Sequence, residues 1–248
     1  MDLNLDGDVA LVTASSSGLG KASARSLVDS GADVVINGRD RQKLDDAVRE
    51  LSADCDGAIV GEQADLTDPE AVEQLVERPV EAYGSLDHLV ISVGGPPRLQ
   101  FGEATDKHWH DAFELLVMSC VRLVRCATPY LLDGGGTITA ITSRAVKEAT
   151  ATNVLSSSVR MSVVGLCKCL SNELAPEVRV NVVIPGPFDT PRRSDSSRGS
   201  SASASTPVGR IGNPVELGDT VAFVCSFRGG FINGSPIVVD GGAGRSTL

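Results

Sequence analysis

The sequence predicts a single α/β domain with a parallel sheet between two layers of helices. Short runs of apolar, β-branched residues alternate with helix-length segments along the whole chain, which is the order of repeated strand–helix–strand units. The runs are apolar at nearly every residue, as in strands covered on both faces. No linker divides the 248 residues, and that length suffices for one sizeable core. We therefore expect one domain over 1–248, a doubly wound, Rossmann-like fold with seven parallel strands.

The strands are read from β-branched and apolar runs bounded by glycine, proline or aspartate. VALVTA opens the sheet, and DVVING forms the second strand, which the chain enters through Gly31. The predicted strands are 9–14, 33–38, one within 58–68, 86–93, 136–143, 178–186 and 234–242.

The segments between the strands carry apolar residues at helical spacing. The first helix is marked by Ala22, Ala24, Leu27 and Val28, directly after the first strand. The later predicted helices are 40–52, 69–83, 106–130, 156–175 and a last helical region before the seventh strand. The Ser-rich segment 190–207 is too polar to pack, so we expect a mobile substrate loop there, or alternatively a surface insertion.

Charge and composition exclude several classes of partner. The formal net charge of -10 argues against nucleic acid and against an anionic membrane surface. We see no signal peptide and no apolar stretch of membrane-span length, so we expect a cytoplasmic protein with a small-molecule substrate. The six cysteines are scattered, and Cys167 and Cys169 point in different directions on a helix. The sequence therefore predicts free thiols and no metal site.

A glycine turn follows the first strand and opens the first helix, in TASSSGLG. The start of a helix offers unpaired backbone N–H groups and a positive dipole end to a pyrophosphate. Glycine belongs there because a Cβ would hold the ligand away from the backbone. The predicted dinucleotide-binding residues of this turn are Thr13, Ser15, Ser16, Ser17, Gly18, Leu19 and Gly20.

The choice of dinucleotide is read at the end of the second strand. An acidic residue there would bind the ribose 2′-hydroxyl of NAD(H), whereas arginine would pair with the 2′-phosphate of NADP(H). The chain has Gly38 and then Arg39, with no carboxylate before Asp40. This favours NADP(H), with NAD(H) possible; the alternative for Arg39 is that it caps a surface turn.

Several motifs in this order resemble the short-chain dehydrogenase/reductase family, in the part that looks like 3-oxoacyl-carrier-protein reductases. TASSSGLG stands for the family's TGxxxGxG, with Ala14 at the first glycine. ADLTD matches the segment whose Asp65, followed by Leu66, would meet the adenine. VNVVIPGPFDT is close to VNxVxPGxxxT, and VGRIGNPVELGDTVAFVCS with FINGSPIVVDGG is similar to the C-terminal signature. The resemblance implies that three residues lie beside the nicotinamide: Pro185, Gly186 and Thr190.

The departures from the family cluster at its chemistry. ISVGG stands where the family has NNAG, which leaves Ser92 and Gly94 as the residues facing the cofactor. The usual catalytic asparagine falls near Leu116. The substrate-orienting serine is matched by Ser143, but the tyrosine and lysine positions hold Ser156 and Arg160. With GGPP after the fourth strand, this pattern resembles a divergent reductase-like subgroup.

The four candidate catalytic residues are Ser143, Lys147, Ser156 and Arg160. A serine hydroxyl titrates far from neutral pH and is shorter than a phenol, and arginine keeps its charge but does not release a proton. Lys147 could donate the proton if desolvation lowered its pKa, could bind an anionic substrate, or could be a solvated loop residue. A water held by Ser143, Ser156 and Arg160 is a second route, with Arg160 stabilising the oxyanion.

These observations support two hypotheses. The first is an NADP(H)-dependent oxidoreductase acting on a small carbonyl or alcohol, of the 3-oxoacyl type if the resemblance extends that far, with a non-standard catalytic site. The second is a non-catalytic dinucleotide-binding regulator or scaffold that keeps the fold. The resemblance also implies a homotetramer or dimer, assembled through the helices at 106–130 and 156–175.

Overall fold

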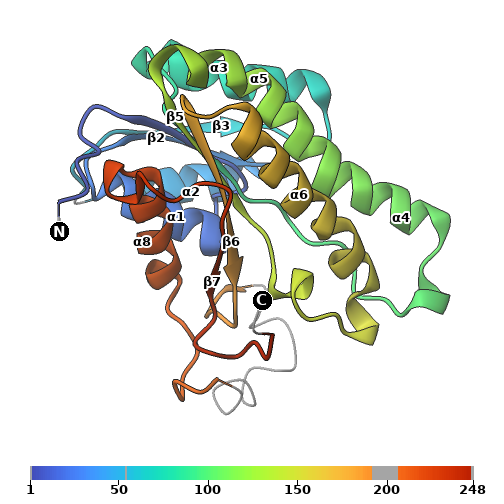
Figure 1. Ribbon diagram of the computed structural model, residues 1–248. Helices are drawn as coiled ribbons and strands as arrows, with labels where there is room; N and C mark the ends of the chain where they lie inside the picture. Colours follow the sequence, from blue (N-terminus) through green and yellow to red (C-terminus); the bar gives the residue numbers. More distant parts are fainter. Residues whose placement is uncertain (1, 54, 192–205, 247–248) are drawn as a thin grey trace.

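Seven parallel strands form one sheet in the order β3-β2-β1-β4-β5-β6-β7, which confirms the predicted fold class (Figure 1). The computed structural model describes residues 2–53, 55–191 and 206–246. The direction of strand succession reverses between β1 and β4, so a crevice opens there at the carboxyl ends of the strands. The strands are β1 Val9–Val12, β2 Asp33–Gly38, β3 Ile59–Gln63, β4 His88–Ile91, β5 Gly136–Ile141, β6 Val178–Pro185 and β7 Pro236–Val239.

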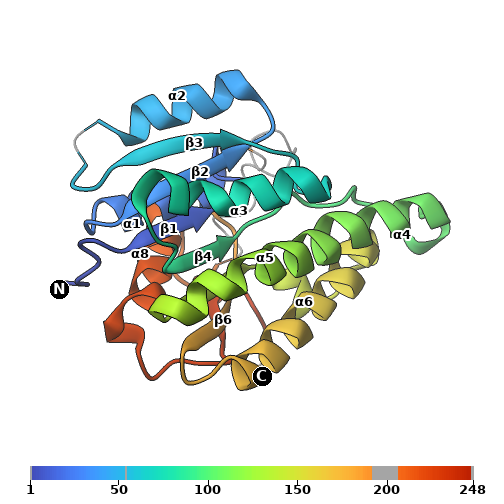
Figure 2. The same cartoon turned by 90° about the horizontal axis from the view of Figure 1, so that it is seen from above.

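Helices cover both faces of the sheet, and each layer encloses its own core (Figures 1 and 2). One layer holds α1 Gly18–Val28, α2 Arg41–Leu51 and α8 Pro214–Cys225. The other holds α3 Pro69–Tyr83, α4 Asp106–Phe113, α5 Ser119–Gly134 and α6 Val154–Glu173. The residues of the inner strands β2, β1, β4, β5 and β6 are buried almost throughout, which explains why their sequences lack polar alternation, whereas the edge strands β3 and β7 are only partly buried.

The predicted long helix at 106–130 contains an unpredicted π-helical segment. Between α4 and α5 the chain runs through a π-helical stretch at Glu114–Met118, where the Ser119 hydroxyl donates to the carbonyl of Leu115 at 2.5 Å. A π turn widens the helix by one residue and changes which side chains face a neighbouring site. This segment lies beside the crevice and matters for the candidate site.

Among the described residues, two helices reach the length and mean apolarity of a membrane span, Asp106–Gly134 and Ala151–Glu173. The expectation that no apolar stretch is that long holds only for uninterrupted runs, because polar residues are interspersed in both helices. In their most apolar windows, 44% and 33% of the residues are buried, and both helices contribute to the core against the sheet. Helices that pack in a protein core can reach the same length and apolarity, so this finding does not indicate a membrane span.

Strand ends differ most from the predicted boundaries. The segment 86–93 narrows to His88–Ile91, and 234–242 narrows to Pro236–Val239. Beyond Ile91 the chain leaves the ladder and enters the turn with Pro96 and Pro97, which have no N–H to donate. Of the predicted loop 190–207, residues 192–205 lie outside the described residues.

Candidate active site

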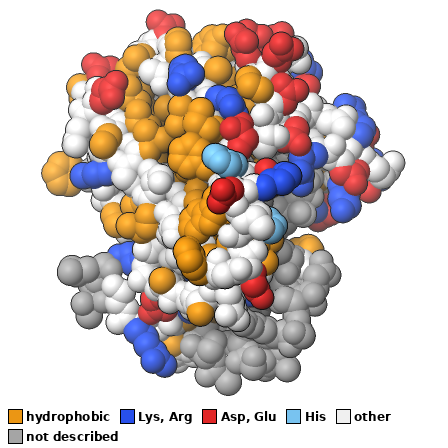
Figure 3. Space-filling model, turned by 90° about the vertical axis from the view of Figure 1, so that its right-hand side faces the viewer, with side chains coloured by type: hydrophobic (Ala, Val, Ile, Leu, Met, Phe, Trp, Pro, Cys, Tyr) orange, Lys and Arg blue, Asp and Glu red, His pale blue; other side chains and the backbone are white. Residues whose placement is uncertain are grey.

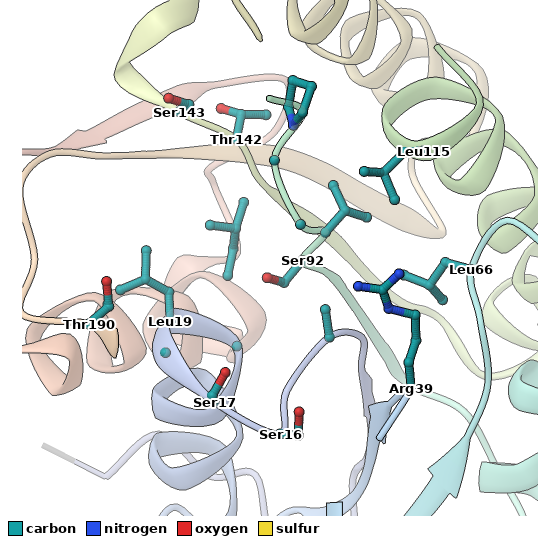
Figure 4. A pocket seen from close by; sticks show the side chains of 18 of the residues that line it. Ser16, Ser17, Leu19, Arg39, Leu66, Ser92, Leu115, Thr142, Ser143 and Thr190 are labelled. Carbon is teal, nitrogen blue, oxygen red and sulfur yellow. The ribbon is translucent and has the colours of Figure 1, made fainter. Parts of the chain in front are cut away.

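A cleft of about 520 Å³ opens at the carboxyl ends of β1, β2, β4 and β5 (Figure 4). Its walls come from the turn after β1, the end of β2, the loop after β4, the π-helical segment, the start of α6 and the chain after β6. This is the crevice where doubly wound sheets bind ligands. The cleft therefore joins the predicted dinucleotide turn to the predicted catalytic residues in one space.

The turn after β1 presents backbone groups to this cleft. Gly18 has φ +61°, and a Cβ on Gly20 would lie 2.7 Å from the carbonyl oxygen of Ala14, so both positions exclude larger residues. Ser17 is the N-cap of α1, but its side chain makes no capping hydrogen bond. The first N–H groups of α1 consequently face the cleft with the positive end of the helix dipole behind them.

The predicted residues of this turn separate into two groups. Ser16, Ser17, Gly18, Leu19 and Gly20 line the cleft.

Thr13 and Ser15 do not line the cleft, which corrects their predicted role. The Thr13 hydroxyl donates to Ser92 O at 2.7 Å and accepts from Ser92 N at 3.0 Å. The Ser15 hydroxyl donates to Val12 O at 2.5 Å and accepts from Asn37 N at 2.9 Å. Both hydroxyls are buried because they fasten the turn to neighbouring strand ends, where the backbone needs partners.

Arg39 extends from the end of β2 toward Leu66 at one end of the cleft (Figure 4). Its Nη1 lies 3.9 Å from Oδ2 of Asp65, and both side chains are largely solvent-accessible. Burial raises the pKa of Asp65, but hydrogen bonds from Thr67 and the charge of Arg39 outweigh it and hold the pKa below its usual value. The N-cap of α2 is Asp40, the residue that follows Arg39.

The loop after β4 forms the wall opposite the turn. Its residues Ser92 to Arg98 all line the cleft. The carbonyl of Gly94 accepts a hydrogen bond from Nη2 of Arg160 at 3.0 Å. A Cβ at Gly94 would meet no atom within 4 Å, so this glycine borders open space. The loop is thus tied to α6 by the residue that stands at the family's lysine position.

The start of α6 carries a polar stripe into the cleft. Asn153, Ser156 and Arg160 are spaced by three and four residues, so they share one helix face, and all three line the cleft. Arg160 is 6% exposed. Ser143 lines the same cleft just beyond the end of β5, and its hydroxyl accepts from Ala145 N at 3.2 Å. The structure therefore brings Ser143, Ser156 and Arg160 together, as predicted.

Lys147 is not part of this lining. It follows the 3₁₀ turn Arg144–Val146, half-buried outside the cleft.

The predicted nicotinamide segment contributes only one of its three residues. Thr190 lines the cleft next to Gly18, where an added Cβ would lie 3.8 Å from Cγ2 of Thr190. Pro185 pairs with Val239 inside the sheet, and Gly186 N donates to Val239 O at 2.8 Å. A Cβ on Gly186 would lie 2.4 Å from Cα of Asp240. These two residues shape the end of β6, and their place beside the nicotinamide stays a prediction.

The described lining of the cleft contains no tyrosine, lysine or histidine. Tyr83 ends α3, and burial raises the pKa of its phenol to about 12. His88 lies at the opposite end of the sheet, buried between Asp8 and Thr137 at 3.0 Å each. At the family's asparagine position the π-helical segment turns Leu115 into the lining and buries Leu116. No ordinary general acid is at hand in this part of the chain.

Sequence reasoning missed two asparagines in the lining, Asn37 and Asn153. Asn37 accepts from Ala14 N at 3.1 Å and donates to the carbonyls of Glu62 and Ala64 at 3.2 Å each, so it joins three strand ends. A single amide in the apolar strand DVVING was its signal. Asn153 is the N-cap of α6, yet its side chain makes no cap bond. Its spacing of three residues from Ser156 could have revealed it.

Comparisons with known proteins agree with this geometry. A family model described as enoyl-(acyl carrier protein) reductase matches residues 13–244. An uncharacterized oxidoreductase of Methylorubrum extorquens is 32% identical over 244 residues, which cover 96% of this chain and 98% of the relative. A 3-oxoacyl-[acyl-carrier-protein] reductase of Thermotoga maritima is 26% identical, over 97% and 99%. The solved L-sorbose reductase of Gluconobacter frateurii, complexed with NADPH and L-sorbose, superposes with a TM-score of 0.92 at 29% identity, over 99% and 100% of the chains.

Proposed function

Because the chain belongs to the short-chain dehydrogenase/reductase family of oxidoreductases, we propose that it interconverts a small carbonyl compound and its alcohol with NADP(H). The main support for this proposal is that one continuous cleft runs from the glycine turn after β1 to Ser143 and Arg160. A regulator that only bound a dinucleotide would not need a polar stripe at the far end of that cleft.

The residues present fit NADP(H). The start of α1 supplies N–H groups for a pyrophosphate, and the glycines leave the close approach that it needs. Arg39 suits a 2′-phosphate, and Asp65 is ionised beside it and suits the adenine amine. NADPH in the related L-sorbose reductase supports this choice. When bound, the cofactor supplies or accepts the hydride.

At the other end, the polar side chains suit a substrate carbonyl. Ser143 and Asn153 offer a hydroxyl and an amide N–H for its oxygen, and Arg160 supplies a fixed positive charge. This charge stabilises the oxygen as it becomes negative, which is the electrostatic part of the family's catalysis. The proton comes from water held by Ser143 and Ser156, because the described lining offers no titratable donor near neutral pH.

The decisive experiment compares wild type with Arg160→Ala and, as a matched control, Arg144→Ala. Arg144 lies outside the cleft lining, with Nε 3.8 Å from Glu148. NADPH binding is followed by its fluorescence, and oxidation is followed with ketones, ketoses and acyl thioesters. We expect turnover that falls at least about a hundredfold in Arg160→Ala and stays within twofold in Arg144→Ala.

Two results would contradict the proposal in different ways. Saturable NADPH binding without turnover across the panel would favour the non-catalytic dinucleotide-binding protein. Failure to bind either NADPH or NADH would reject both functions. The compartment stays a prediction: all six cysteines are free, which supports a reducing cytoplasm.

A further inference from the structure

The cleft has the opposite charge to the chain that forms it. The sequence carries a net charge of -10, yet the charged residues in the described lining are Arg39, Arg98 and Arg160 against Asp65. Arg39 and Asp65 lie together at the dinucleotide end. The substrate end is therefore lined by two arginines and, within the described chain, by no carboxylate. A cleft of this sign concentrates anions in an otherwise anionic protein.

Arg98 is the arginine that is available to a ligand. It is solvent-exposed, and no hydrogen bond or ion pair to its guanidinium exists in the described structure. Arg160 is instead buried and donates to the Gly94 carbonyl, so it holds the loop after β4 and supplies its charge to the substrate carbonyl. The two guanidinium groups have separate tasks.

The loop that carries Arg98 is stiff. Pro96 and Pro97 fix their own φ angles, and Pro96 is buried. The Arg160–Gly94 hydrogen bond holds the same loop against α6 two residues before the prolines. Arg98 is thereby presented at the rim of the cleft by a backbone that loses little entropy when a ligand binds.

We propose that the substrate is a carbonyl compound with an anionic oxygen group, a carboxylate or phosphate, and that Arg98 binds this group. The inference rests on the proposed function and names its substrate class. Arginine suits the role because its planar fork pairs with two oxyanion oxygens at once. The anion-binding role considered for Lys147 thus passes to Arg98, since Lys147 lies outside the lining.

The test uses matched pairs of anionic and neutral carbonyl compounds. Levulinate is compared with methyl levulinate, and dihydroxyacetone phosphate with dihydroxyacetone; L-sorbose is a further neutral compound. The enzymes are wild type, Arg98→Gln and the control Arg144→Gln. We expect wild type to prefer at least one anion by about tenfold or more in kcat/KM, and Arg98→Gln to bring that ratio below about threefold. NADPH affinity should stay within twofold.

Which pair shows the preference distinguishes a carboxylate from a phosphate. Equal use of charged and neutral compounds, or a preference that persists in Arg98→Gln, would overturn the assignment. Weaker NADPH binding in Arg98→Gln would show that Arg98 serves the cofactor instead.

A failure of the proposed function is recognised separately. If no compound is turned over, calorimetry measures levulinate and dihydroxyacetone phosphate binding to the protein with and without NADP⁺. Binding that is lost in Arg98→Gln and retained in Arg144→Gln would support the anion site in a protein that does not catalyse. No binding of either anion to wild type would overturn it.

Discussion

At the scale of single residues, Ala14 stands in a backbone conformation that glycine adopts more readily, with φ +45°. Its amide donates to Asn37 at 3.1 Å, and the residue lines the cleft at the dinucleotide turn. We expect Ala14→Val to lower the free energy of unfolding by about 2 kcal/mol, because a β-branched side chain tolerates this region poorly.

Ala14→Gly is the control for this strain. Glycine relieves the strain of the left-handed conformation in the folded state, but its greater conformational freedom stabilises the unfolded chain by a similar free energy. The free energy of unfolding should therefore change by less than about 1 kcal/mol. Urea unfolding of both variants measures the difference. A fully tolerated valine would mean that the turn relaxes out of the left-handed region.

The tyrosine and lysine that the family carries can be restored at Ser156 and Arg160, which tests their loss. If the missing proton donor limits the reaction, Ser156→Tyr with Arg160→Lys should raise kcat at least about tenfold, since general acid catalysis contributes factors of that size or more. The pH dependence of kcat should gain a limb from the phenol. Ser156→Phe with Arg160→Lys keeps the ring without the hydroxyl, and an equal gain there would refute the explanation.

Residue-level prediction worked where side-chain chemistry and position in a motif coincided. Ser143, Ser156 and Arg160 were matched to catalytic positions of the family by resemblance, and all three line the cleft. Thr13 and Ser15 were misassigned because a hydroxyl beside a strand end can serve either a ligand or the backbone, and sequence does not show which. The hydrogen-bond partners that decide between these roles, Ser92 for Thr13 and Asn37 for Ser15, lie far along the chain.

At the scale of elements, α8 begins with a capping box. The Asn213 side chain accepts from Val215 N at 3.1 Å, and Glu216 accepts from Asn213 N at 2.8 Å. Asn213→Ala should lower the free energy of unfolding by about 1 kcal/mol, because an N–H at the helix start loses its partner. Urea unfolding measures this, and Asn213→Asp, which keeps the acceptor, should change it far less.

The capping box of α8 also predicts a pH dependence of the free energy of unfolding. The hydrogen bond from Arg210, followed by that from the Asn213 amide, lowers the pKa of Glu216 to about 2. Since this folded-state pKa lies below the ordinary value of 4.5, its stabilisation is present above that value and is lost as the pH falls toward 2. Glu216→Gln should therefore flatten the decline of unfolding free energy across this range. An unchanged slope would show that the pKa of Glu216 is the same in the folded and the unfolded chain.

Element prediction failed mainly at irregular backbone. The bounds Asp33–Gly38 and Pro69–Tyr83 were predicted from the sequence because turn and capping residues flank them. The π-helical segment Glu114–Met118 has no such marker, and its residues read as ordinary helix. The wider turn puts Leu115 in the cleft lining and buries Leu116, the residue that the resemblance had placed at the family's asparagine position.

At the scale of the whole molecule, one face remains unusually apolar. Figure 3 shows hydrophobic side chains gathered over the side that carries α4, α5 and α6. Phe113 is 46% exposed and Met161 is 49% exposed on this side. A patch of this kind commonly marks a protein–protein interface. It is consistent with the homotetramer or dimer that the family resemblance implies, assembled through the helices at 106–130 and 156–175, and that assembly stays a prediction.

Gly165 offers a test that separates assembly from folding. It lies on the exposed side of α6, one helical turn beyond Met161, and a Cβ there would meet no atom within 4 Å of the same chain. Gly165→Glu should stabilise an isolated protomer by about 0.5 to 1 kcal/mol through helix propensity. In an assembly it buries an unpaired charge, so sedimentation should shift from dimer or tetramer to monomer. Gln42→Glu adds the same charge on α2, away from this face, and should leave the assembly intact. If Gly165→Glu sediments like wild type, the apolar face of α6 does not hold the subunits together.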